Sequence, residues 1–250
     1  MIYITGDTHS DFSRFNRSNF SEQKHMTKED FVIICGDFGG IWDEKESNTE
    51  TYWLDWLDHK NFTTLFLCGN HENFDRLYAY PIEMWHGGKV HKIRDSVIHL
   101  MRGQVYELCG KIFFTFGGAK SHDMEGRILD PAAPGYQLKK KELDRSGRFY
   151  RVAHKSWWEQ ELPSEDEMRE GRENLAAYHN HVDYILTHCA PTSVQEQLGR
   201  ADYGADILTE YLEQIHKECR YRRWFCGHYH KDGVINRRDR VIYEALLRIV

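Results

Sequence analysis

Side chains that commonly bind metal ions occur at five separate points along the chain. They are Asp7, His9, Asp37, Asn70, His188, His228 and His230. Mixed imidazole and carboxylate donors suit borderline divalent ions such as manganese, iron, zinc or nickel, with manganese favoured, and make calcium a poor fit. In extended backbone, residues two apart point to the same side, so Asp7 with His9 and His228 with His230 could each chelate an ion. The sequence therefore predicts a transition-metal site.

Each of these motifs follows a short apolar run typical of a strand buried on both faces. The runs span residues 2–5, 31–35, 65–68, 184–187 and 224–226. Ligands of open α/β sheets gather outside the carboxyl ends of the strands, so five such endings can converge on one site. A glycine, which allows a tight turn, separates the run from the motif everywhere except at Thr187–His188.

Each motif alone is weak evidence. A Gly-Asp pair after a strand is more often a turn or a helix cap, and a lone histidine is more often an ordinary surface or core residue. His71–Glu72 does not extend to the zinc-protease pattern H-E-x-x-H, because residue 75 is Asp75. The motifs occurring together, in this order and at strand ends, favour metal binding over these alternatives.

The combined pattern D-x-H, G-D, G-N-H-E, H and G-H-x-H resembles that of the calcineurin-like metallophosphoesterase superfamily, and it extends from Asp7 to His230. The resemblance implies a fold of two mixed sheets packed face to face with helices outside. It implies that one metal is held by Asp7, His9 and His230, that the other is held by Asn70, His188 and His228, and that Asp37 bridges them. His71 would be the catalytic histidine and not a ligand.

Two departures from the superfamily pattern and one further similarity show where in the superfamily the chain would belong. Many members extend the second motif to G-D-x-x-D, but here Gly40 occupies the later position, which is not a metal-ligand position. The serine/threonine protein phosphatase branch shares the run G-N-H-E, yet it expects an arginine-bearing G-D-x-V-D-R-G and lacks G-H-x-H. Membership of that branch is therefore disfavoured. Residues 117–123 resemble the corresponding segment of bacterial and phage members.

The resemblance implies a hydrolase that cleaves phosphate esters with a hydroxide shared by two divalent ions. Diesters and monoesters both remain open, with nucleotide-type substrates favoured. His71 would donate a proton to the departing oxygen. His122 and Lys120 are possible phosphate contacts, but they could equally be loop residues that face the solvent. A protein phosphatase and a non-catalytic metal-binding scaffold are the competing interpretations.

The remaining sequence predicts an α/β fold with two packed mixed sheets flanked by helices, as a single domain over residues 1–250. Helices are expected over residues 50–59 and 205–219, and another from a capping box at Ser164 toward Tyr178. Residues 97–101, 104–108 and 111–116 suggest an antiparallel meander. Residues 233–236 and 241–245 suggest a hairpin.

Composition limits the partners. The net charge of −6 argues against a protein that coats nucleic acid, but a nucleotide or nucleic acid could bind a local basic stretch with aromatic residues. That stretch comprises Lys139, Lys140, Lys141, Arg145, Arg148 and Arg151 with Phe149 and Tyr150. A solvated helix face is the simpler interpretation. A small phosphorylated substrate is the other expected partner, and the oligomeric state is open.

Composition also limits the cellular location. No segment is apolar enough to span a membrane, and the first residues lack the features of a secretory signal, so cytoplasmic residence is expected. The six cysteines are too scattered for a disulfide scaffold and should be reduced thiols that fill buried strands.

Overall fold

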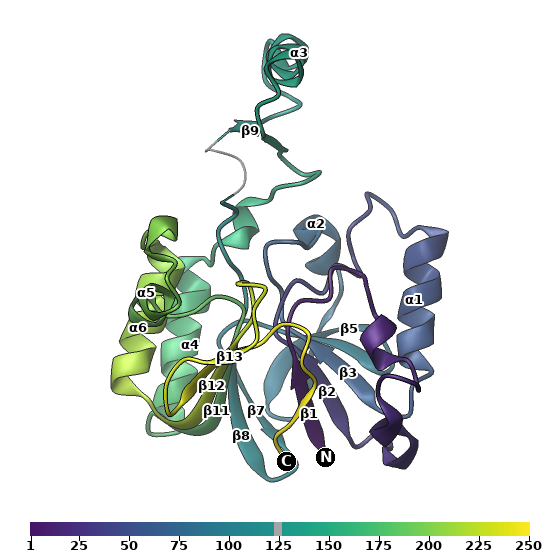
Figure 1. The fold of residues 1–250 in the computed structure, drawn as a ribbon, viewed down its shortest axis with the longest axis vertical. Helices are drawn as coiled ribbons and strands as arrows, with labels where there is room; N and C mark the ends of the chain where they lie inside the picture. Colours follow the sequence, from purple (N-terminus) through teal and green to yellow (C-terminus); the bar gives the residue numbers. More distant parts are fainter. Residues whose placement is uncertain (123–126) are drawn as a thin grey trace.

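The computed structural model describes residues 1–122 and 127–250, so Asp123 of the predicted superfamily segment lies outside the described residues. Two large mixed sheets lie face to face with helices on their outer sides (Figure 1). The first sheet has the order β15-β1-β2-β3-β6-β5-β4. Its strands are β1 (Ile2–Thr5), β2 (Phe31–Ile34), β3 (Thr63–Phe66), β4 (Ile82–Trp85), β5 (Gly88–Arg94), β6 (Val97–Leu100) and β15 (Leu247–Arg248). The four central strands, β1, β2, β3 and β6, are parallel to one another.

The second sheet has the order β13-β14-β12-β11-β8-β7. Its strands are β7 (Gln104–Leu108), β8 (Lys111–Phe116), β11 (His181–Thr187), β12 (Arg220–Cys226), β13 (Gly233–Val234) and β14 (Asp239–Val241). The central strands β8, β11, β12 and β14 are parallel, and β13 and β7 run antiparallel at the two edges. Parallel centres buried on both faces explain why the apolar runs do not alternate with polar residues.

Successive side chains of each central strand enter different cores. In β1, Ile2 and Ile4 pack between the sheets, whereas Tyr3 packs on the outer side. In β11, Leu186 lies between the sheets and Ile185 lies on the outer side. Each sheet therefore needs cover on its outer face, and amphipathic helices supply it.

Helix α1 (Asn48–Asp58) covers the first sheet through Leu54 and Leu57. Helices α4 (Glu165–Ala177) and α6 (Ile207–Glu218) cover the second sheet. The shorter helices are η1 (Ser13–Phe15), η2 (Ser21–His25), α2 (Phe74–Leu77), η3 (Glu159–Glu161), α5 (Thr192–Gln197) and η4 (Ala201–Tyr203). The predicted capping box is present: Ser164 accepts from the amide of Glu167, whose side chain accepts in return. The predicted α/β/β/α layering is confirmed.

The predicted meander is wrong. Strand β6 belongs to the first sheet, where it pairs with β3 and β5, whereas β7 and β8 form an antiparallel pair in the second. The chain crosses between the sheets at residues 101–103, where Gly103 has a φ of 70°. A glycine turn between two strand-like runs looks the same in sequence whether the runs pair or separate.

The predicted hairpin pairing is confirmed, with Gly233 opposite Val241, but the second strand is β14 (Asp239–Val241) and not residues 241–245. The antiparallel pair β4 and β5 was not predicted, because all four residues of β4 are at least partly exposed and carry little of the strand signal.

Residues 127–157 form a projection, here called the arm, that extends away from the two sheets (Figure 1). It contains β9 (Ile128–Leu129), which pairs in parallel with β10 (Arg151–Val152), and helix α3 (Tyr136–Ser146). Every residue of α3 is at least partly exposed. The arm therefore adds little to the core, and the single-domain boundary over residues 1–250 stays a prediction.

Two compositional expectations can be compared with the described residues. Among them, no helix combines the length and the apolar character that crossing a bilayer would require. Cytoplasmic residence stays a prediction. All six cysteines are free, and only Cys109 is exposed, which confirms the expected reduced, mostly buried thiols.

Candidate metal centre

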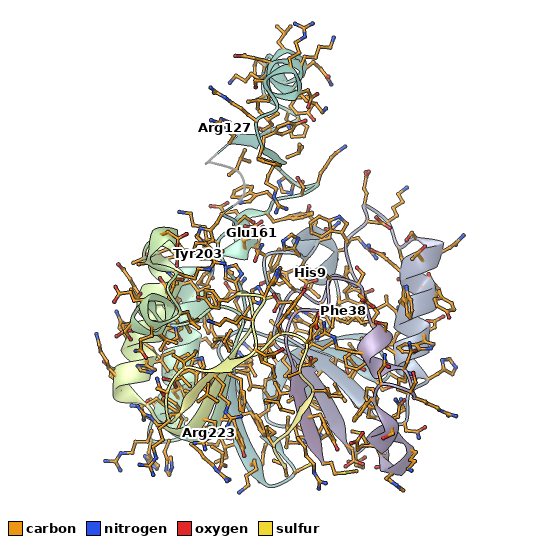
Figure 2. The ribbon with its side chains drawn as sticks, viewed as in Figure 1. His9, Phe38, Arg127, Glu161, Tyr203 and Arg223 are labelled. Carbon is orange, nitrogen blue, oxygen red and sulfur yellow. The ribbon has the colours of Figure 1, made fainter. Side chains whose placement is uncertain are left out.

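The carboxyl ends of five strands from both sheets meet at one edge of the molecule. Strands β1, β2 and β3 of the first sheet and β11 and β12 of the second end there, and each is followed by predicted ligands. Figure 2 shows His9 at this edge, below the arm, and Arg223 near the opposite end. The site thus exists only where the two sheets are packed together.

Four predicted ligands form a compact cluster. One donor atom from each of Asp7, His9, Asp37 and His230 lies within 4.8 Å of the others. His230 Nε2 lies 3.2 Å from Asp7 Oδ2 and 3.0 Å from His9 Nε2, and His9 Nε2 lies 3.6 Å from Asp37 Oδ2. Two carboxylates and two imidazoles at this spacing match the donor set of a divalent transition metal.

The other predicted ligands lie beside this cluster on the far side of Asp37. His188 Nε2 is 3.3 Å from Asp37 Oδ1, and the rings of His188 and His228 are 5.0 Å apart. Asn70 is buried, and its backbone N–H donates to Asp37 Oδ1 at 2.8 Å. Asp37 thus lies between the two groups, where a bridging ligand would be required.

His228 and His230, which are two residues apart, do not point to the same side as they would in an extended strand. His230 joins the compact cluster, whereas His228 faces His188 and His122. The reason is the backbone: φ is 68° at His228 and 46° at His230, in the left-handed region that L-residues rarely adopt. His9 and Asp37 share this strained conformation, with φ of 44° and 46°. Such strain persists only where surrounding structure enforces it, typically at functional sites.

Backbone amides hold both carboxylates in place. Asp37 Oδ1 accepts from the amides of Asn70 and His71 at 2.8 and 2.9 Å, and Asp7 Oδ1 accepts from the amide of His228 at 2.9 Å. Each carboxylate therefore ties its own loop to the loop of another strand. Because Asp7 belongs to the first sheet and His228 to the second, one of these contacts crosses between the sheets.

The glycines before the motifs have a role beyond turning. A Cβ at Gly36 would lie 2.1 Å from His188 Nδ1, one at Gly69 would lie 2.0 Å from Asp37 Oδ1, and one at Gly227 would lie 2.3 Å from Asp7 Oδ1. Any side chain at these positions would displace a predicted ligand. The glycines are thus required because the loops pack directly against the donor groups.

The electrostatics of the centre favour bound positive charge. Burial alone would disfavour the charged forms of both Asp37 and His188. His188 and its neighbours nevertheless hold the pKa of Asp37 well below its usual range. Conversely, Asp37 and Asp7 overcome burial and raise the pKa of His188 to about 9. His188 Nδ1 lies 2.9 Å from the carbonyl of Cys35, which orients the ring so that Nε2 points at Asp37.

His71 lies at the rim of the centre. Its ring centroid is 4.9 Å from that of His9, and it stacks on Trp42 at 5.8 Å with the planes 28° apart. Burial lowers the pKa of His71, with Asp37 acting in the opposite direction. His71 also lines the pocket next to the ligands. The structure thus places it where a group bound in the pocket would contact its ring.

The pocket has a volume of about 220 Å³ and is lined by both ligands and non-ligands. His122 lines it, whereas Lys120 is exposed to solvent. His122 stacks on Tyr203 with ring centroids 4.0 Å apart, and the guanidinium of Arg200 lies over the Tyr203 ring, 5.1 Å from its centroid. Arg151, from the arm, also lines the pocket.

Arg200 and Tyr203 were not recognised in the sequence. They lie in and beside η4, outside every motif, and an arginine and a tyrosine near a glycine carry no ligand signal. Arg151 was identified only as part of the basic stretch. Neither its place in the pocket nor that of Arg200 could be inferred without knowing how the arm and η4 fold over the strand ends.

Two buried carboxyl groups lie near the centre: Glu161 was not recognised in the sequence, and Glu72 was recognised only as part of the motif G-N-H-E. Glu161 is 2% exposed and accepts from the amide of Ser121 at 3.1 Å, while Ser121 Oγ lies 3.4 Å from Asn70 Nδ2. Burial raises the pKa of Glu161 to about 8. Glu72 is fully buried, and accepts from the amide of Phe38 at 2.8 Å. Both groups brace the loops that carry Asn70 and Asp37.

Comparison with known protein families gives one match. A family model described as calcineurin-like phosphoesterase matches residues 1–232 of the 250. Among curated proteins, no sequence matches the chain.

Proposed function

This chain belongs to the calcineurin-like phosphoesterase family, and we propose that it is a two-metal hydrolase of phosphate esters. The family implies metal-dependent phosphoester hydrolysis in general. The number of metals, the roles of individual residues and the kind of ester are our proposal. The observation that carries it is the meeting of two donor groups around Asp37 at the strand ends.

The residues fit two metal ions. Among the described residues, Asn70 Oδ1 is buried without a hydrogen-bond partner, a costly arrangement that a metal would relieve. Buried His188 Nε2 makes no hydrogen bond of good geometry, and only the Asp37 carboxylate faces it, at 3.3 Å. In our assignment Asp7, His9 and His230 hold one ion, and Asn70, His188 and His228 hold the other. Asp37 bridges them. Manganese is the favoured ion, and iron, zinc or nickel suit the same donors.

Two divalent ions in this centre would supply a hydroxide at neutral pH and would bind the phosphoryl oxygens. The protein contributes geometry. Asp7 and Asp37 are the only anionic groups in the donor set, and the amides that hold them also fix their direction. With two carboxylates and a neutral Asn70, the loaded centre keeps an excess of positive charge, which favours an anionic phosphate.

His71 is proposed to donate a proton to the departing oxygen. Trp42 supports one face of its ring, and the backbone amide of His71 is anchored on Asp37, so the imidazole is held in place. An alkoxide leaves poorly, and a positioned imidazole has the pKa range to protonate it.

Arg151 and Arg200 are proposed to bind the phosphate or its neighbours, and His122 to contact the substrate. Guanidinium groups suit phosphate because they donate two parallel hydrogen bonds. Tyr203 lines the same pocket and contacts both His122 and Arg200, so its ring holds these two proposed substrate contacts in position. Lys120 is the weaker of the two predicted phosphate contacts, because it is exposed.

The test is hydrolysis of a chromogenic diester and a chromogenic monoester by chelator-treated protein that is then supplied with manganese, iron, zinc or nickel. We expect turnover that depends on the added metal, with about two metal ions bound per chain by elemental analysis. Absence of turnover on both esters with every metal would favour the non-catalytic scaffold. Preference for phosphorylated peptides over both esters would favour a protein phosphatase.

A further inference from the structure

The arm differs from the rest of the chain in charge. Residues 127–157 contain eight lysines and arginines but three aspartates and glutamates, a net charge of +5. Because the whole chain carries −6, the other residues together carry −11. An anionic ligand approaching the pocket is thus repelled by the body and attracted by the arm.

The charges of α3 are not used by the fold. Lys139, Lys141 and Arg145 are exposed, and within the described chain none of them has an ion-pair partner. The helix has one internal pair, Lys140 with Asp144 at 3.0 Å. Leu138 shares the exposed face with Lys141 and Arg145 and is itself 75% exposed. This face is therefore available to a partner.

The arm leads from this basic face to the pocket. Arg151 lines the pocket and begins β10, and the exposed Arg148 lies three residues before it. Chain geometry limits the separation of their Cα atoms to about 11 Å. Phe149, between them, is 73% exposed. Basic and aromatic residues thus follow one another in the sequence from the end of α3 to Arg151 at the proposed phosphate site. Figure 1 shows α3 at the end of the arm farthest from the two sheets.

We propose that the arm binds a single-stranded nucleic acid and directs one of its phosphodiesters into the pocket. This inference rests on the proposed function, and it names the substrate class of that site. A nucleic-acid strand repeats the phosphate at every nucleotide, so the same chemical group satisfies the pocket and the basic face. Exposed Phe149 offers a surface on which a base can stack, and stacking requires unpaired bases.

Binding is measured by fluorescence anisotropy with a labelled oligothymidine strand in chelator, so that no hydrolysis takes place. The variant Lys139→Glu/Lys141→Glu/Arg145→Glu should bind at least about tenfold more weakly at low salt. Its salt dependence should also be shallower by about two in log Kd against log salt, since each phosphate contact contributes about 0.7 for single strands. Phe149→Ala should weaken binding by about tenfold with an unchanged salt dependence.

The matched control is Lys24→Glu/Arg220→Glu/Arg222→Glu, which makes the same change in net charge with exposed residues of the body. Arg220 and Arg222 lie in the first half of β12, at the end of the strand away from the centre. This control should bind the strand within about twofold of wild type at moderate salt, where distant charges are screened.

Hydrolysis separates this inference from the proposed function. With manganese, the arm variant should cleave the small chromogenic ester at the wild-type rate but should have a KM for the oligonucleotide raised at least about tenfold. Loss of small-ester turnover in the wild type would overturn the proposed function, whereas the anisotropy result would still stand. Equal strand binding by the arm variant and the control variant would overturn the arm's role. So would tight binding of the arm to vesicles of phosphatidylserine without binding of the strand.

Discussion

The metal centre and the arm meet at Arg151 and differ in how their side chains are held. Asp7 and Asp37 are 1% and 2% exposed, backbone amides hold them, and glycines pack against the ligands. In the arm, by contrast, every residue of α3 is at least partly exposed, and Leu138 and Phe149 point into solvent.

The difference follows from what each region has to do. Catalytic groups must be held to within a fraction of an ångström, so the centre uses strained backbone and buried hydrogen bonds that only a packed core can enforce. Attraction of a charged polymer depends on the number and sign of charges over a wide surface, and it tolerates loose side chains. Substitutions in the centre should therefore abolish hydrolysis of every ester, whereas substitutions in the arm should alter only which substrates bind well.

The largest effect is expected for Asp37→Ala. Removal of the bridging carboxylate should lower turnover of every ester by at least about a thousandfold, more than the ten- to hundredfold typical of outer-shell partners, and should reduce bound metal. Kinetics and elemental analysis on the same sample provide the check. The exposed Asp95, near the opposite end of the first sheet, gives the control Asp95→Ala. Full metal content and activity in Asp37→Ala would be incompatible with a bridging role.

A smaller but still large effect is expected for His71→Ala. Turnover should fall by about 10²–10⁴-fold with near-normal metal content, because a proton donor is lost and no ligand is removed. The loss should shrink for esters with acidic leaving groups, which depart without protonation. Steady-state kinetics over a series of leaving groups measures this, with the exposed His59→Ala as control. A loss that is the same for every leaving group would contradict proton donation.

An effect on stability is expected at the junction of arm and centre. Burial raises the pKa of Glu161 to about 8, whereas the pKa of a glutamate in the unfolded chain is about 4.5. Between these values the unfolded chain binds fewer protons, so stability falls as pH rises. Relative to Glu161→Gln, which cannot ionise, the wild type should lose on the order of 3 kcal/mol between pH 5 and pH 8. Urea unfolding at both pH values tests this, and parallel behaviour of the two proteins would refute it.

The smallest effect is expected in α3. Leu138→Ala should change the free energy of unfolding by less than about 0.5 kcal/mol, since the side chain is 75% exposed. The same change at the fully buried Leu212 of α6 should cost about 2–5 kcal/mol. Chemical denaturation of both variants makes the comparison. A similar cost at the two leucines would show that the arm is packed against something and that its contrast with the body is wrong.

The sequence predicted the central strands and the place of the ligands because both depend on local pattern. Runs such as residues 2–5 are mostly apolar and fully buried, and each motif follows its run within two or three residues, so strand and ligand come from the same stretch of chain. The ligand roles came from family resemblance, and they stay proposals.

What the sequence did not predict depends on contacts between distant residues. The strand-like run at residues 97–100 indicates a strand but not which sheet that strand joins. Likewise, Glu161 is linked to Asn70 by hydrogen bonds through Ser121. These three residues come from different parts of the chain. The left-handed backbone at His228 and His230 is set by the packing of the loop, and so local spacing predicted the wrong geometry for this pair.

The sharing of the centre between two sheets has a consequence for biosynthesis. A chain growing from the ribosome carries Asp7 and Asp37 early, but His188 is made only after β11, and His228 and His230 only after β12. Nascent chains and prematurely terminated products should therefore be inert toward phosphate esters, and the cell would be protected from a hydrolase that is only half assembled.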